Sequence, residues 1–598
     1  MSSFKTVLVR DSVIGDITSD IDYAVKSGAS QCTFQQFPST SASNSALIFN
    51  VQVPSENTII GRDMMINTGL TFRLNITNVP AGQVAFNYGR ADSLHAFPLN
   101  SLFSTATAQI NNTTVSINTQ DVLPALLRMN DSRELYRFNS TTPSLPDQAY
   151  GVLNQAVGAG NSPMGEYADS AYDVDQTPRG AFPISYGVSH LVGGVGVPNT
   201  SLLSIGLTDT WVITVSTVVS EPLILSPFIF GDPEYNQQGF LGINNMTFTL
   251  NIDSTCKRLF SSGNPFQVGG VGAGYVTTIQ LGSVADSNGF KYQPQAFGTI
   301  LAPVGGTSPQ LLLKLLSSQP SDLIQSKNIV PYMDFPRYLT TSALASAVAP
   351  NATTTLTSSN LQINQIPDLF IINIRKPMNQ QTIFDADAFF KINNISINLN
   401  NQSGLLSSAT AYDLWRMSVK NGSTQSWAEF SGQASNVDPA TGILTQVATT
   451  GSLLVISPAY DLSLPDYLTC GSLGNYNFQF TVGVTNQFTS SIAPEMIVIT
   501  ANSGIFTTQQ GVSSIYTGIL TKEMVLDAKS KQQASAMKSA EVRRMTGGSL
   551  WNSLSGIVKR VLPYAQRVAE DPDVQKFALA KGKSLLGLGT SGGAKRYC

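Results

Sequence analysis

The chain has 598 residues, of which 42% are hydrophobic and 12% are charged, and its formal net charge is −3. This length favours more than one domain, and ample apolar residues with few charges exclude a largely disordered chain. Charged residues are about half as common as in ordinary globular proteins. Neutral polar residues take their place, which favours β-sheet and broad contact with other chains.

The small net charge hides a split along the sequence. Residues 521–598 contain 14 lysines and arginines against 6 aspartates and glutamates, a balance of +8, so the preceding residues are acidic. Residues 1–16 lack the apolar core of a signal peptide. No apolar run approaches the roughly 18 residues of a membrane span. We therefore expect a protein made inside the cell, without a signal peptide or a transmembrane segment.

The first half begins after a polar stretch. Residues 1–45 are predicted to form an N-terminal arm, because they are polar and Pro38 would interrupt a sheet. Alternating apolar residues then predict strands at 46–53 and 70–76. The first domain is expected to span 46–260. Its Gly- and Pro-rich stretch 130–207 is too long for an ordinary connection and is interpreted as a loop excursion.

The clearest local pattern is a hairpin followed by a helix. Residues 106–110 and 114–118 are rich in Thr, Val and Ile and predict two strands. Asn111-Asn112 predicts the tight turn between them, because Asn tolerates the left-handed conformation. Asp121 is predicted to be the N-cap of the helix that follows, with Pro124 in its first turn.

The same unit is predicted to occur a second time. Ile392-Asn393-Asn394 matches Ile110-Asn111-Asn112, and both copies lead into a helix that ends in Arg-Met. Residues 221–227 and 452–458 form a second matching pair in the same order. These matches indicate a tandem duplication, although chance similarity between polar strands is the alternative.

The second half is expected to follow a linker at 261–274, where Gly and Pro are dense, and to span 275–520. Its predicted strands include 369–374, 389–399, 453–456, 478–484 and 496–500, with short helices at Gln310–Leu316 and Thr340–Ala349. Residues 521–598 form a basic tail with two predicted helices, 522–544 and 549–569. The second helix is amphipathic, so it can pack on the body, bind a partner or bind a membrane surface.

Residues typical of catalysis are scarce. The only histidines are His95 and His190, and the chain has no GxSxG motif. The Gly-rich run 269–274 lacks the Lys of a phosphate loop and is interpreted as linker. Asp385 and Asp387 can bind a cation, but a solvated turn is the preferred interpretation. The four cysteines (Cys32, Cys256, Cys470 and Cys598) are far apart. We predict no catalytic, cofactor-binding or metal-binding residue, and no enzyme.

Two stretches carry a resemblance to a known family. Residues 37–41 (FPSTS) and 90–112 (RADSLHAFPLNSLFSTATAQINN), together with the duplication, resemble the major capsid proteins of virophages and Polinton-like (Maverick) viruses. The resemblance implies an all-β fold of two tandem eight-stranded jelly rolls, with a short helical C-terminal tail. It also implies homotrimeric, pseudo-hexagonal capsomers that tile an icosahedral virion shell, in contact with neighbouring capsomers, penton proteins and minor capsid proteins.

A second resemblance is local to the tail. Met545-Thr546-Gly547-Gly548 before Ser549 resembles a cleavage site of viral adenovirus-type cysteine proteases. Leu585-Leu586-Gly587-Leu588 before Gly589 resembles a second, weaker site. Paired glycines let an extended strand enter a narrow protease cleft. The tail is thus a candidate scaffold that is removed after Gly548, and its basic charge favours DNA or a membrane as a partner.

Two other functions fit the composition. A β-rich carbohydrate-binding adhesin or glycoside-active enzyme would need an export signal or a carboxylate-lined groove. A minor capsid or spike protein would share the jelly rolls and differ in its copy number per particle.

Overall fold

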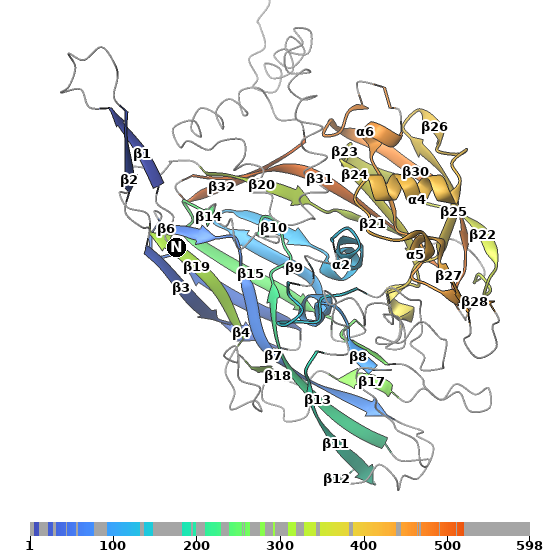
Figure 1. Cartoon of the computed structure of the whole chain (residues 1–598), viewed down its shortest axis with the longest axis horizontal. Helices are drawn as coiled ribbons and strands as arrows, with labels where there is room; N and C mark the ends of the chain where they lie inside the picture. The colour runs from blue at the N-terminus through green and yellow to red at the C-terminus, as the bar shows by residue number, and fades with distance from the viewer. Residues whose placement is uncertain are drawn as a thin grey trace, which may run out of the picture.

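The computed structural model shows two β-barrels side by side, the first in blue to green and the second in yellow to red (Figure 1). It describes residues 5–10, 22–27, 31–43, 45–55, 58–76, 92–131, 135, 137–146, 182–192, 195–198, 210–228, 239–253, 255, 258–262, 276–280, 291–293, 309–317, 328–341, 347–381, 387–437, 444–462, 464–465, 468–488, 491–509 and 511–518.

The first barrel packs a large sheet against a five-stranded sheet. The strands of the large sheet are β3 (Gln31–Pro38), β6 (Thr58–Gly61), β7 (Met65–Ile76), β11 (Ser185–Val192), β12 (Val195–Pro198), β13 (Thr210–Pro222), β14 (Gly239–Phe240), β17 (Val276–Gln280), β18 (Lys291–Gln293) and β19 (Gln310–Ser317). The five-stranded sheet has the order β10 (Thr113–Ile117), β9 (Phe103–Ile110), β15 (Asn245–Ile252), β5 (Ala46–Gln52), β4 (Ser41–Ala42).

The second barrel repeats this architecture. One sheet consists of β20 (Asn328–Asp334), β21 (Arg337–Thr341), β24 (Leu369–Arg375), β29 (Leu454–Ile456), β31 (Glu495–Gln509) and β32 (Val512–Thr517). The other consists of β22 (Thr353–Thr357), β23 (Leu361–Gln365), β25 (Lys391–Leu399), β26 (Gln402–Leu405) and β30 (Leu473–Thr485).

Short elements complete the described chain. They are α1 (Pro98–Leu102), α2 (Thr119–Leu127), α4 (Ala411–Lys420), α5 (Trp427–Ser431), α6 (Pro458–Asp461), the 3₁₀ turn η4 (Met378–Gln380), and three two-stranded sheets: β1 (Lys5–Arg10) with β2 (Asp22–Ser27), β8 (Asp92–Leu94) with β16 (Phe260–Ser262), and β27 (Gln433–Val437) with β28 (Leu444–Ala448).

Side-chain alternation explains why these segments are strands. In β5 and β15 every second residue is buried, as expected when one face of a sheet packs on a core and the other faces solvent. Phe49 and Phe248 are opposite each other in this pair and lie in the core of the first barrel. The prediction of an all-β fold is therefore confirmed.

The boundary between the barrels is not where the sequence placed it. β19 pairs with β3, β6 and β7 of the first barrel, although it follows the predicted linker at 261–274. The prediction of a helix at Gln310–Leu316 is wrong, because this segment is β19. β3 lies within the predicted arm 1–45 and pairs with β19 along its whole length. The first barrel therefore extends to Ser317, and the second begins at Asn328.

The duplication is visible at the hairpins, but its register differs from the predicted one. The turns that correspond are Asn111-Asn112 and Asn400-Asn401, whereas Asn393-Asn394 lies inside β25. Asn111 and Asn400 both have a left-handed backbone, with φ of 50° and 51°. The Asn111 N–H donates to the carbonyl of Asn245 in β15, and its side-chain oxygen accepts the N–H of the preceding residue, Asn244. Asn400 makes the equivalent pair of hydrogen bonds with Asn477 in β30. The sequence match therefore places the second hairpin turn several residues before its position in the structure.

Candidate functional site

The two barrels share a sheet that is buried on both faces. Along β24, Leu369 and Ile371 pack into the core that includes the first barrel, while Phe370, Ile372 and Ile374 pack into the core of the second barrel. β31 alternates in the same way, and both strands are almost wholly apolar at this point. A continuous apolar run is the pattern expected of a strand covered on both faces. The contact between the barrels is thus part of the hydrophobic core.

A ribbon of three strands of the second barrel, β20, β31 and β32, extends this contact over the first barrel. β20 and β32 pair with opposite edges of the C-terminal part of β31. Phe506 of this ribbon is fully buried and its ring lies 6.0 Å from that of Phe240 in the first barrel. Asn328 Nδ2 donates to the carbonyl of Gly239 at 2.7 Å.

The ribbon ends on the Asn111 hairpin tip, which we define as residues 111–113. Asn111 Nδ2 donates to Ser513 Oγ at 3.0 Å, and Thr113 Oγ1 donates to the Ser513 carbonyl at 2.6 Å. The Ser513 N–H donates to Asn112 Oδ1 at 2.7 Å. The turn that the sequence singled out is therefore both a hairpin turn and a contact between the barrels.

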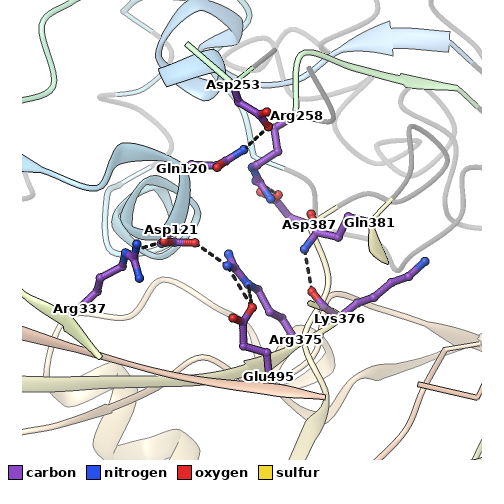
Figure 2. Close-up of polar contacts among 10 residues, drawn as sticks. All are labelled: Gln120, Asp121, Asp253, Arg258, Arg337, Arg375, Lys376, Gln381, Asp387 and Glu495. Carbon is purple, nitrogen blue, oxygen red and sulfur yellow. Dashed lines mark hydrogen bonds and ion pairs between the residues drawn. The ribbon is translucent and has the colours of Figure 1, made fainter. Parts of the chain in front are cut away.

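Helix α2 carries an ion-pair network into the second barrel (Figure 2). Asp121 lies between Arg337 of β21, at 2.6 Å, and Arg375 of β24, and Arg375 also pairs with Glu495 of β31 at 3.3 Å. Asp121 is therefore not the N-cap that was predicted, because α2 begins at Thr119 and the N-cap residue is Asn118. Since the helix starts early, Pro124 lies inside it rather than in its first turn.

A second ion cluster is fully buried. Asp387 pairs with Arg258 and, at 3.2 Å, with Arg128, which immediately follows α2. Burial alone would raise the pKa of Asp387, but the charges of Arg258 and Arg128 outweigh it and, with His95, hold the pKa well below its usual range. The preferred prediction of a solvated turn at Asp387 is therefore wrong. The positive charges that surround Asp387 are the side chains of two arginines of the same chain. Asp385 lies outside the described residues.

A buried carboxylate holds the first helix. Glu221, at the end of β13, accepts the N–H groups of Leu99 and Asn100 at 2.8 Å each, together with the side chains of Asn100 and Thr142. These donors lie at the start of α1, where a helix leaves its N–H groups unpaired. Burial raises the pKa of Glu221 to about 7, although the four hydrogen bonds oppose the shift.

The remaining predicted sites are placed only in part. The cleavage candidates Met545, Gly547, Gly548, Ser549, Leu588 and Gly589, the rest of the tail and the run 269–274 lie outside the described residues. Among the described cysteines, Cys32 is exposed, Cys470 is buried and both are free thiols. Within the described ranges, no group of His, Cys, Asp and Glu forms a metal site, and no helix is long and apolar enough to cross a membrane.

Paired jelly rolls joined through a common core define the class of double jelly-roll proteins. Comparison with known families agrees in both halves. The family of the Sputnik virophage major capsid protein first domain matches residues 2–289, and that of the major capsid protein V20 C-terminal domain matches residues 335–504. The chain therefore belongs with the double jelly-roll major capsid proteins of virophages.

Individual relatives point the same way. The putative capsid protein V20 of Sputnik virophage is 25% identical over 565 residues, which cover 92% of this chain and 86% of that protein. The cryo-EM structure of the Sputnik virophage contains a chain that is similar with a TM-score of 0.68 at 24% identity, over 87% of this chain and 95% of that one. The mavirus major capsid protein is similar with a TM-score of 0.58 at 16% identity, over 88% and 98%.

These relatives favour a capsid role among the functions that the sequence left open. They are structural capsid proteins, so this chain is a capsid component of a virion and not an enzyme. The adhesin and glycosidase alternatives find no support among them.

Proposed function

We propose that this chain assembles as homotrimeric, pseudo-hexagonal capsomers that tile an icosahedral shell. The observation that carries the proposal is the shared core between the barrels, because it fixes two similar barrels as one rigid unit. Three such units supply six similar barrels for a closed ring. Closed rings arise when a surface on one subunit binds a different surface on the next.

The test is the mass of the purified full chain, with negative-stain images of the same sample. A particle of about three times the chain mass of 63.9 kDa, with a hexagonal outline, is the expected result. A stable monomer at micromolar concentration would refute the capsomer proposal. Copy number per virion then separates a major capsid protein from a minor capsid or spike protein.

The tail is proposed to act before maturation, as a scaffold that a viral adenovirus-type cysteine protease removes after Gly548. The support is the Met545–Ser549 sequence and its position beyond Thr517, the end of β32, which is the last strand of the described chain. Replacing Gly548 by Val is expected to block cleavage by the protease, because a β-branched side chain does not fit a cleft shaped for glycine. Cleavage of the variant at the wild-type rate would refute this site.

Contacts of the tail with DNA or a membrane, and of the capsomer with penton and minor capsid proteins, belong to the same proposal. The balance of +8 in residues 521–598 supports an anionic partner. Such binding should weaken steeply as salt is raised.

A further inference from the structure

The ribbon of β20, β31 and β32 has two sides, and one of them faces the first barrel. In Figure 1 the ribbon lies above β10 and β14 of that barrel. Residues that lie opposite each other in an antiparallel pair have their side chains on the same side of the sheet. Val330, Phe506 and Ile515 are opposite one another, and all three pack in or against the core of the first barrel. The residues next to them in each strand lie on the other side, which we call the outer face.

The outer face is apolar, although it is turned away from the first barrel. On β32, Val512 is 59% exposed and Tyr516 is 38% exposed. Three residues of β20 and β31 beside them are half-buried and are part of neither described barrel core: Ile329, Pro331 and Ile505. The hydroxyl groups of Thr507 and Ser514 are hydrogen-bonded to each other at 2.7 Å, so the polar pair within this face is satisfied. An apolar surface of this kind is typical of a site that binds another segment.

The tail leaves the second barrel at the edge of the outer face. β32 ends at Thr517, and the next residue, Gly518, lies against Leu473, which is 66% exposed. A Cβ atom on Gly518 would be 2.9 Å from Leu473 Cδ2. Residues 519–598 of the sequence follow from this point. Any segment within them is therefore tethered beside the outer face.

The sequence of the tail contains a segment that fits this face. The predicted helix 549–569 is amphipathic, with basic residues such as Lys559 and Arg560 away from its apolar side. Its apolar side includes, at helical spacing, Leu550, Leu554, Ile557, Val558 and Val561. Asp334 is the only charged residue in β20, β32 and residues 503–509 of β31. The ribbon therefore offers apolar contacts to the helix and no positive charge that would repel it.

We propose that the predicted helix 549–569 docks on the outer face of its own chain, and that cleavage after Gly548 releases it. The release rests on the cleavage proposed above. Before cleavage, residues 519–548 tether the helix at an effective concentration on the order of 1 mM, so even weak binding covers the face. Cutting the tether removes this advantage. The helix then dissociates, and the outer face becomes available to other contacts in the mature particle.

The first experiment measures backbone hydrogen exchange of residues 549–569 in the full chain by mass spectrometry. A single amphipathic helix is only marginally stable in water, so slow exchange requires that its apolar side is packed. The face variant carries Tyr516→Gln and Val512→Gln together. Phe34→Gln is the matched control, because it makes the same kind of change at a 78% exposed residue of β3 in the first barrel.

Exchange in the helix is expected to be slow in wild type and in the control. In the face variant it is expected to be faster by about tenfold or more, because an aromatic and an aliphatic contact are lost. Fast exchange in wild type would overturn the docking, and equal protection in the face variant would show that the helix docks elsewhere. Protection that falls on dilution would assign it to a second copy. Protection that appears only with phosphatidylserine vesicles would assign it to a membrane.

The second experiment tests release without the viral protease. Residues 545–549 of the full chain are replaced by the recognition sequence of an unrelated protease, and the cut chain is passed over a size-exclusion column. The fragment that carries the helix is expected to separate from the body, and a fragment that stays bound would overturn release. Failure of the viral protease to cut after Gly548 would overturn the proposed cleavage alone, because the exchange measurement tests docking independently of it.

Discussion

Asp387 is the residue whose removal should disturb the barrel contact most. The Asp387→Asn change keeps the shape of the side chain and removes its charge, which leaves Arg258 and Arg128 buried without their shared counter-ion. Side chains of all three residues are at most 8% exposed. Removing one partner of a buried ion pair lowers the free energy of unfolding by about 3–5 kcal/mol. We expect a loss of stability in this range.

The measurement is urea unfolding followed by tryptophan fluorescence, with the transition midpoint and slope compared between variants. Asp131→Asn is the control, because it makes the same chemical change at an exposed aspartate outside this cluster. Adding Arg258→Met to Asp387→Asn should recover part of the loss, since one unpaired charge is then removed. A single variant that unfolds within about 1 kcal/mol of wild type would refute the reasoning.

The pH dependence of the folding stability is a second test of the role of Asp387. The pKa of Asp387 is lower in the folded chain than in the unfolded chain, where it is 3.8. Its contribution to stability is therefore complete above about pH 4 and is lost as the pH falls towards the folded-state pKa. Asp387→Asn should show a flatter loss of stability below pH 4 than wild type, and an unchanged acid limb would contradict this.

Three further changes test other parts of the fold. Asn111→Ala should destabilise the chain by about 2–4 kcal/mol in urea unfolding, because it removes side-chain hydrogen bonds and places Ala at a left-handed φ. Asn401→Ala, in the hairpin turn of the second barrel, is the control. The raised folded-state pKa of Glu221 means that wild-type stability should fall as the pH rises from about 4.5 to 7, and Glu221→Gln should abolish this slope in thermal melts. Ile371→Ala should cost about 2–5 kcal/mol, as a buried residue of the shared core, and an unchanged melting temperature would contradict its placement there.

Local pattern was enough to predict strands such as β5, β9 and β10, because their pattern of apolar residues depends only on neighbouring residues. It predicted the hairpin around Asn111 and the all-β fold. It did not separate strand from helix at Gln310–Leu316, because the run QLLLKLL fits either period, and only its pairing with β3 and β7 makes it a strand. The barrel boundary was misplaced for the same reason.

The ion pairs could not be predicted from patterns of neighbouring residues. Asp387 lies 129 residues from Arg258 and 259 from Arg128 in the sequence, so no spacing rule connects them. Asp121 fitted the N-cap rule by composition, yet its partners are on another barrel. One usable signal was present: the apolar run Leu369–Ile372 has no polar residue on either face, which indicates a strand covered on both faces and hence a second layer packed against it.

The duplicated barrels carry different chemistry at equivalent positions, and the difference follows from when each contact forms. The contact within the chain is always present at high local concentration, so it can rely on buried apolar strands and on ion pairs such as Asp121 with Arg375. A surface that waits for a separate copy must remain soluble. It is therefore expected to carry isolated apolar groups among polar ones rather than a continuous apolar strand. The proposed capsomer accounts for this difference, because only the contact within the chain is permanent.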